Sequence, residues 1–359
     1  MISLNRLLRA MLENKASDLH VTSGCAPSFR VNGRMIRTKL EALKPADAKE
    51  LCYSILTEKQ KAQLENDRQL DLSFGIKDLA RFRANIFYQR GAIAGAFRHI
   101  PFDIPKLSNL GLPPVVKELI HKPKGLILIT GATGSGKTTT LASLIDYLND
   151  NENLHVLTIE DPIEFIHSHR RSVINQRELG TDAHSFSSAL KASLREDPDI
   201  VLVGEMRDKE TIETALTLAE TGHLVLSTLH TSSAHQTITR IIQSFPTDHQ
   251  EQIRVQLSLT LEGVICQTLV PKKDQTGRMV AVEVMVPNAA IRNLIRENKL
   301  HQVQSAMLVG QEQSGMITLN QSLAYLVVEG LVNESEAVSA TPDPGDLLRL
   351  LTAPERRAS

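Results

Sequence analysis

Residues 126–148 read LILITGATGSGKTTTLASLIDYL, and this stretch decides the fold of the domain around it. Its first five residues form an apolar run typical of a buried strand, and the segment after Lys137 has apolar residues at helical spacing. Between them, Gly131 to Thr138 match the pattern GxxxxGK(S/T) in full. A strand, a glycine-rich turn and a helix in this order predict a loop that cradles phosphate groups.

Each residue type in this loop has a physical task. Glycines let backbone N–H groups curl around phosphate oxygens, and the helix N-terminus adds partial positive charge. Lys137 can reach the β- and γ-phosphates, and the Thr138 hydroxyl can hold Mg²⁺. A glycine-rich turn that binds nothing is the alternative, and the flanking strand and helix disfavour it. We therefore predict ATP and Mg²⁺ as cofactors, bound by Gly131, Ala132, Thr133, Gly134, Ser135, Gly136, Lys137, Thr138 and Thr139.

Acidic side chains follow two further apolar stretches. The stretch 155–159 runs into Glu160, Asp161 and Glu164, and the stretch 200–203 runs into Gly204 and Glu205. The carboxyl ends of strands are where α/β sheets bind ligands. We predict that Glu160 or Glu164 orients the attacking water and that Glu205 holds Mg²⁺ through water. The alternatives are a solvated acidic turn and a strand-end glutamate without a role, and the neighbouring phosphate loop disfavours both.

Two histidines, His223 and His230, flank the apolar stretch 224–229. In a protein with a phosphate loop they indicate a sensor of the γ-phosphate or a contact between subunits. A shared zinc site is disfavoured, because seven residues along a strand separate two side chains by roughly 23 Å. A purely structural role for each histidine is the remaining alternative.

Length and composition indicate an ordinary globular protein. The chain has 359 residues, of which 42% are hydrophobic and 23% charged, and this length suggests two or three domains. Residues 1–100 have the pattern of a small α+β domain, the proline-containing stretch 101–114 is the expected linker, and 115–359 form the second domain. The alternation of strands and helices after the linker predicts an α/β domain, a mostly parallel sheet with helices on both faces. The last ~20 residues are expected to be a mobile tail.

Individual elements follow from apolar periodicity and turn residues. In the first domain we expect a helix ending near Lys15, a helix over 45–65, and strands over 19–22, 28–31, 35–38, 70–75, 80–88 and 92–99. In the second we expect strands over 125–130, 155–159, 200–203 and 224–228, with helices over 138–148, 185–195 and 209–221. After residue 285 the pattern is mainly helical as far as about Glu336.

Composition also excludes several classes of protein. The three cysteines are far apart, so a disulfide framework and a CxxC metal site are disfavoured and a cytoplasmic protein is expected. No apolar run approaches the ~18 residues of a spanning helix, and the N-terminus does not resemble a signal peptide. A net charge of −1 and an aromatic content of 4% disfavour a nucleic-acid partner. Work at a membrane would therefore need a partner protein, without direct membrane insertion.

Four segments in order, GATGSGKTTT, TIEDPIE, DIVLVGEMRD and GHLVLSTLHT, resemble the Walker A, Asp box, Walker B and His box of type II/type IV pilus secretion ATPases. The resemblance covers nearly the whole chain. It implies a PAS-like α+β domain followed by a RecA-like ATPase domain, assembled as a homohexamer. It also favours Glu164 over Glu160 as the base. In similar ATPases, arginines at the places of Arg83 and Arg98 reach the nucleotide from the N-terminal domain, and surface charge is their alternative role.

Within this family the chain is similar to the ATPases that retract type IV pili. It is short, lacks the four-cysteine zinc insertion, and carries AIRNLIRE at 290–297. The resemblance implies pilus retraction and twitching motility, with an inner-membrane platform protein as partner and a location at the inner membrane through that partner. An extension or secretion ATPase and an accessory retraction paralogue remain alternatives. A DNA motor and a nucleotide switch without hydrolysis are disfavoured by charge and by the intact Lys137, Glu164 and Glu205.

Overall fold

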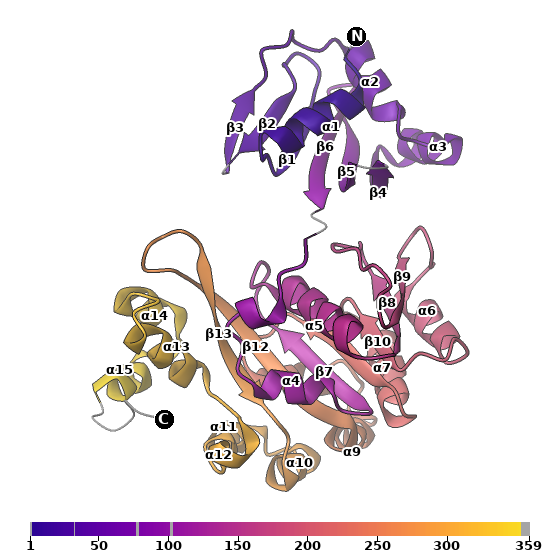
Figure 1. The fold of residues 1–359 in the computed structure, drawn as a ribbon. Helices are drawn as coiled ribbons and strands as arrows, with labels where there is room; N and C mark the ends of the chain where they lie inside the picture. The colour runs from indigo at the N-terminus through magenta and orange to yellow at the C-terminus, as the bar shows by residue number, and fades with distance from the viewer. Residues whose placement is uncertain (1, 32, 77–78, 101–102, 353–359) are drawn as a thin grey trace. The chain divides into compact units, whose positions relative to one another are not determined.

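The computed structural model describes residues 2–31, 33–76, 79–100 and 103–352, and it divides into two compact units (Figure 1). Met1–Asp103 and Glu164–Ile166 form the N-terminal unit, and Ile104–Ile163 and His167–Ser359 form the C-terminal unit. Residues 101 and 102 of the expected linker lie outside the described residues. Leu107, further along it, is buried in the C-terminal unit, within the short 3-10 helix η1 (Leu107–Asn109).

The N-terminal unit is a six-stranded antiparallel sheet in the order β3-β2-β1-β6-β5-β4, with three helices. Its elements are α1 (Leu4–Glu13), β1 (Asp18–Val21), β2 (Ser28–Val31), β3 (Arg34–Arg37), α2 (Pro45–Tyr53), α3 (Glu58–Asp67), β4 (Gln69–Ile76), β5 (Ala80–Gln89) and β6 (Ala92–Ile100). All the strands expected here are present. The single helix expected over 45–65 is wrong, because Thr57 leaves the helical conformation and caps a new helix by accepting from the Gln60 N–H at 3.3 Å.

The C-terminal unit is built on a seven-stranded sheet in the order β13-β12-β7-β11-β10-β8-β9. The strands are β7 (Gly125–Thr130), β8 (His155–Glu160), β9 (Val173–Glu178), β10 (Ile200–Val203), β11 (Leu224–Leu229), β12 (Leu261–Pro271) and β13 (Arg278–Met285). All neighbours pair in parallel except β12 and β13. The four expected strands are confirmed, whereas β9, β12 and β13 were not predicted.

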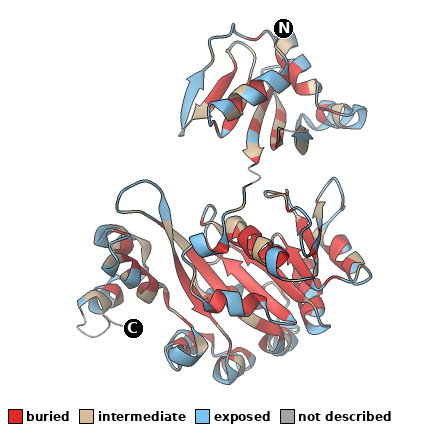
Figure 2. Ribbon diagram, viewed as in Figure 1, coloured by how far each residue is buried: buried red, intermediate tan, exposed pale blue. Residues whose placement is uncertain are grey.

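Helices cover both faces of this sheet, as expected for buried parallel strands. They are α4 (Val115–Ile120), α5 (Lys137–Asn151), α6 (Phe186–Ser193), α7 (Lys209–Glu220), α8 (Ala234–Gln243) and α9 (Gln250–Thr260). Along β7, Ile127 and Ile129 face a core shared with α4 and α5, and Leu126 and Leu128 face a core shared with α7, α8 and α9. Figure 2 shows the strands buried and the outer helix surfaces exposed. The sheet is thus fixed from both sides, and its strand ends are held in place.

The chain after residue 285 is helical, as predicted. It contains α10 (Ala289–Arg296), η2 (Leu300–Gln302), α11 (Val303–Met307), α12 (Gln311–Ser314), α13 (Leu319–Val328), α14 (Glu334–Ala340) and α15 (Pro344–Thr352). The mobile tail is a wrong prediction for 344–352, because Leu347 is fully buried and packs in one cluster with Leu323 and Leu326. Residues 353–359 lie outside the described residues. None of the helices described is long and apolar enough to span a bilayer.

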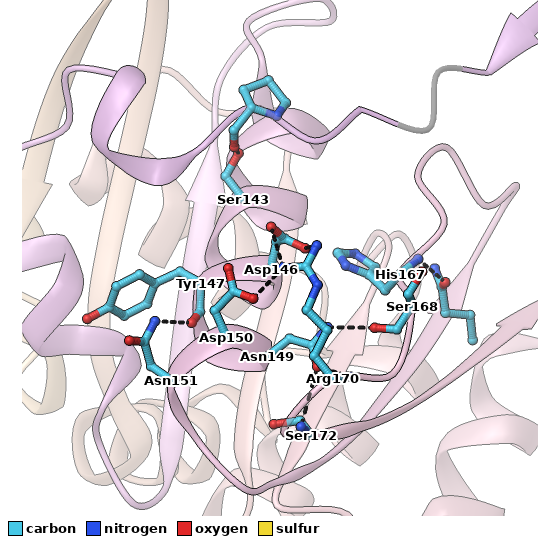
Figure 3. Close-up of polar contacts among 12 residues, drawn as sticks. Ser143, Asp146, Tyr147, Asn149, Asp150, Asn151, His167, Ser168, Arg170 and Ser172 are labelled. Atoms are coloured by element: carbon cyan, nitrogen blue, oxygen red, sulfur yellow. Dashed lines mark hydrogen bonds and ion pairs between the residues drawn. The ribbon is translucent and has the colours of Figure 1, made fainter.

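A buried amide ties α5, the helix that follows the phosphate loop, to the segment before β9 (Figure 3). The Asn149 side chain is fully buried; its Nδ2 donates to the Ser168 carbonyl at 2.7 Å. Its Oδ1 accepts from the N–H groups of Arg170 at 3.1 Å and Ser172 at 3.4 Å. The Arg170 guanidinium pairs with Asp146 at 3.1 Å, but its side chain is 45% exposed. The buried amide, rather than the exposed ion pair, therefore fixes this connection.

Asn149→Ala is expected to lower the free energy of unfolding by about 3 kcal/mol, because three backbone groups lose the buried amide that is their hydrogen-bond partner. Arg170→Ala removes the exposed ion pairs of the same segment and should cost less than about 1 kcal/mol. Urea-unfolding midpoints of the two variants measure the difference. Equal shifts would contradict the assignment of the connection to the buried amide.

Candidate nucleotide-binding site

The phosphate loop leaves β7 at Thr130 and enters α5 at Lys137, as predicted. Gly131, Gly134 and Gly136 have φ of 142°, 79° and 90°, values that side chains disfavour. At Gly131 a Cβ would lie 2.4 Å from the Gln267 carbonyl oxygen and 2.5 Å from the Ser135 Oγ. The loop backbone can therefore take its shape only with glycine at this position.

Lys137 is buried, with 9% of its surface exposed, and its ammonium lies inside the curve of the loop. Nζ donates to the Gly131 and Ala132 carbonyls at 2.8 and 3.0 Å. Thr138 and Thr139 are half-buried in the first turn of α5. The Ser135 hydroxyl is buried and makes no hydrogen bond to any part of the chain that the structure describes. Glycine cradle, ammonium, free hydroxyl and helix N-terminus are together the donor set that a polyphosphate requires.

His230 stands between the loop lysine and Glu205. Its Nδ1 lies 3.5 Å from the Lys137 Nζ, and its Nε2 lies 3.3 Å from the Glu205 Oε1. A neutral ring with its proton on Nε2 satisfies both contacts, since Nδ1 then accepts and Nε2 donates. The structure thus brings together three of the predicted residues. It does so because β7, β11 and β10 are adjacent parallel strands whose carboxyl ends meet at one edge.

Glu205 is ionised at neutral pH. Burial alone would raise the pKa of this carboxyl, but hydrogen bonds and charge from Arg207 and His230 hold it below its ordinary value. The Arg207 guanidinium lies 2.8 Å from Glu205 Oε2. Arg207 stands in the DIVLVGEMRD segment, but sequence reasoning assigned it no role. An ionised carboxylate at this position has the chemistry to hold a divalent cation through water.

The two candidate bases have different surroundings. Glu160, at the end of β8, accepts on Oε1 from the Thr158 hydroxyl at 2.6 Å and from the Gln176 amide at 3.2 Å. Glu164 lies four residues further along and is exposed. Glu160 is therefore a fixed, half-buried carboxylate, whereas Glu164 is a carboxylate open to solvent.

A buried histidine follows this acidic segment. The His167 N–H donates to the Gln176 Oε1 at 2.9 Å, and its ring is buried, with Nδ1 unpaired within the described chain. Burial, with a smaller contribution from the Arg170 charge, lowers the pKa of His167 to about 4. Folding therefore keeps this ring neutral at pH values where the unfolded chain would bind a proton.

The free energy of unfolding is expected to fall as the pH drops from 6.5 towards 4. Over this range the unfolded state binds a proton at His167, whereas the folded state does not. The loss is about 1.4 kcal/mol per pH unit, or about 2 kcal/mol by pH 5. His167→Asn should lose that much less stability between pH 7 and pH 5 than the wild type. The exposed His184→Asn is the control, and thermal melts at both pH values measure the effect. A pH response that is identical in wild type and His167→Asn would exclude His167 as the cause.

His223 lies at the amino end of β11, at the opposite edge of the sheet from the loop. Its carbonyl accepts from the Gly125 N–H at 3.0 Å, at the start of β7. Its Nδ1 lies 3.1 Å from the Leu218 carbonyl oxygen. The structure does not bring His223 to the phosphate loop, so it cannot sense a phosphate held by its own subunit. A contact between subunits remains a prediction for this residue.

Arg83 and Arg98 are cross-strand partners on β5 and β6 of the N-terminal unit. The Arg98 Nε donates to Asp18 at 2.9 Å, while 67% of the side chain remains exposed. Against the effect of burial, hydrogen bonds from Ser17 and Arg98 lower the pKa of Asp18. Arg98 is therefore anchored at Nε within its own unit, with most of the guanidinium exposed.

Gln267 on β12 is a neighbour of the loop that sequence reasoning missed. Its side-chain Nε2 donates to the Thr140 hydroxyl in the first turn of α5 at 2.8 Å. Its backbone carbonyl oxygen packs against Gly131. Because β12 was not recognised as a strand, no signal in the sequence placed Gln267 beside the loop.

The AIRNLIRE segment lies on α10, on which Ile291 and Ile295 form a fully buried apolar face. Arg292 lies on another face. Its guanidinium donates to the Ser258 carbonyl and to the Glu262 Oε1, both at 2.8 Å. The segment thus ties α10 to the junction between α9 and β12.

Comparisons with known proteins find relatives along nearly the whole chain. The family model described as type II/IV secretion system protein matches residues 1–337. The type IV pilus retractation ATPase PilT of Pseudomonas aeruginosa is 46% identical over 94% of this chain and 97% of its own length. The type IV pilus ATPase PilU of the same organism is 38% identical over 96% and 90%. A crystal structure of the pilus retraction motor PilT with bound ADP is 50% identical, covers 97% of this chain and 100% of its own, and has a TM-score of 0.91. The chain belongs to the type II/IV secretion system protein family.

Proposed function

We propose that this chain is an ATP-hydrolysing motor subunit that powers retraction of type IV pili. The observation that carries the proposal is the contact series Lys137–His230–Glu205 at the mouth of a glycine cradle. This series stands in a chain that is 46% identical to a relative named as a pilus retractation ATPase. The solved relative with bound ADP supports a nucleotide as the ligand of this cradle.

The site residues have separable tasks in the proposed reaction. When bound, Mg²⁺-ATP supplies the phosphoryl group and the charge-neutralising cation. Lys137 and the loop N–H groups bind and orient the phosphates, and Thr138 and Glu205 would hold Mg²⁺. Glu164, or Glu160 in its place, takes the proton from the attacking water. His230 senses the occupied loop, because it contacts both Lys137 and Glu205.

Arg83 and Arg98 are proposed to add positive charge at the phosphates from the N-terminal unit. A guanidinium anchored at Nε keeps its two Nη groups for a phosphate, and this supports Arg98 in particular. Six copies are proposed to form a ring in which nucleotide occupancy changes the arrangement of the two units. The expected partner is a pilus platform protein of the inner membrane, with the motor on its cytoplasmic side.

Arg98→Ala is expected to lower kcat for ATP about tenfold, because one of two arginines that stabilise transition-state charge is removed. Arg30→Ala is the matched control, since Arg30 lies 3.6 Å from the same Asp18 carboxylate. Steady-state phosphate release measures both variants. If the two variants hydrolyse ATP equally fast, Arg98 has only its structural contact with Asp18.

The proposed function is tested in two steps. Purified protein with Mg²⁺-ATP should release phosphate without stimulation by DNA, and it should migrate as a ring; monodisperse monomers at high concentration with ATP would contradict the ring. Deletion of the gene should then give excess pili and lost surface motility. Absent pili would indicate an extension ATPase instead. Motility restored only together with a second retraction ATPase would indicate an accessory paralogue.

A further inference from the structure

Glu283 on β13 is a buried carboxylate that the proposed reaction does not use. Only 7% of its surface is exposed, and burial raises its pKa, an effect that the Ala234 N–H partly offsets. Burying a carboxylate costs folding free energy unless it accepts hydrogen bonds from neighbouring donors. Its Oε1 accepts from the Ala234 N–H at 2.7 Å.

Ala234 is the first residue of α8 and is fully buried. The first N–H groups of a helix have no partner within the helix, and side chains or water satisfy them. Here the Glu283 side chain on β13 accepts from the first of these groups. Glu283 therefore fixes the start of α8 to the sheet.

The start of α8 is the far end of the short turn that begins at His230. The Thr231 and Thr237 hydroxyls lie 2.7 Å apart, and Thr237 donates to the Ser233 carbonyl at 2.8 Å, so the turn is tied to the helix along its length. A shift of Ala234 is thus transmitted to His230. The His230 ring can move little without losing a contact, because one nitrogen contacts Lys137 and the other contacts Glu205.

We propose that Glu283 is a positioning residue, which holds the His230 ring between Lys137 and Glu205 by anchoring the first turn of α8. The inference rests on the proposed function, since it presumes that His230 takes part in ATP turnover. It adds a residue from the β12–β13 hairpin, outside the four nucleotide-binding segments, to the machinery of the site.

Glu283→Met keeps the side-chain volume but removes the acceptor, and we expect kcat to fall roughly 10- to 100-fold, as a displaced catalytic neighbour would cause. The KM for ATP and the affinity for a fluorescent ADP analogue should stay within about twofold, because the glycine cradle is untouched. Glu283→Gln retains an acceptor oxygen and should recover kcat to within about threefold of wild type. Should Glu283→Met fail to fold, Glu283→Asp, whose carboxylate is one methylene too short, makes the same test with the same expected fall in kcat.

Ser322→Ala is the matched control, because the buried Ser322 hydroxyl on α13 accepts from the Val282 N–H, next to Glu283 on β13, and has no place in the proposed link to His230. Its kcat should remain within about twofold of wild type. In the double variant with His230→Ala, loss of the Glu283 carboxylate should lower kcat no further, because Glu283 acts only through the His230 ring. Unchanged kcat in Glu283→Met, an equal loss in Ser322→Ala, or additive losses in the double variant would each overturn the proposal. A wild-type kcat in His230→Ala overturns it too, yet leaves the pilus phenotype as the separate test of the proposed function.

Discussion

Lys137→Ala is expected to abolish ATP turnover, with kcat lowered at least about 10³-fold while the fold persists. The ammonium lies inside the curve of the loop, at 2.8 Å from the Gly131 carbonyl oxygen. Without it, charge that develops on the phosphates in the transition state loses the cation that the loop itself supplies. Phosphate release in single-turnover experiments measures the loss.

The buried position of Lys137 makes a control necessary. Lys124→Ala removes an exposed lysine just before β7 and should leave both kcat and the melting temperature unchanged. The melting temperature of Lys137→Ala should also stay close to that of wild type, because the aliphatic stem of Lys137 contributes little to either core. A Lys137→Ala protein that hydrolyses ATP at the normal rate would refute the assignment of the loop.

The phosphate loop could be predicted because its signal is local. Strand, glycine turn and helix follow one another along 126–148, and the positive φ at Gly131 is a property that the sequence pattern itself encodes. The approach of Glu205 and His230 to this loop was also predictable. Each follows an apolar stretch of a parallel sheet, and the carboxyl ends of such strands share one edge.

Gln267 and Glu283 could not be found in this way, because their positions depend on pairing between distant strands. β12 continues directly from α9 without a turn signal, and its register against β7 sets Cys266 opposite Thr130. That register brings the neighbouring Gln267 to the loop. Glu283 stands within the apolar run of β13, where only the partner on α8 explains a carboxylate.

Strand direction explains why the structure does not bring His223 to the phosphate loop of its own subunit. The two histidines stand at opposite ends of one strand, β11. Only the residue after the strand, His230, can lie at the carboxyl edge of the sheet beside the phosphate loop, and His223 lies at the other edge. The wrong prediction of a mobile tail has another cause. Proline, aspartate and arginine dominate the composition there, but Leu347 provides a buried contact that holds α15 on α13. Specific contacts with α13 outweighed the average composition.

Glu164→Gln is expected to lower kcat about 10³-fold with nucleotide binding retained, which would identify Glu164 as the base. Its side chain is exposed, so its oxygens are open to water, and the family resemblance favours it. Glu160 differs, because Thr158 and Gln176 both donate to its Oε1 and fix the carboxylate within its own subunit. A neutral amide at position 160 can still accept both hydrogen bonds.

Glu160→Gln should therefore lower kcat less than about tenfold, and it is the isosteric partner for the comparison. The decisive measurement is the ratio of the two single-turnover rates at saturating Mg²⁺-ATP, with the affinity for ATP measured in parallel. Glu164→Gln should bind ATP with unchanged affinity and hold it unhydrolysed, since Lys137 and the loop are intact. A more severe loss in Glu160→Gln would reverse the assignment. The hydrogen bonds from Thr158 and Gln176 would then orient Glu160 as the base, and its role would not be only structural.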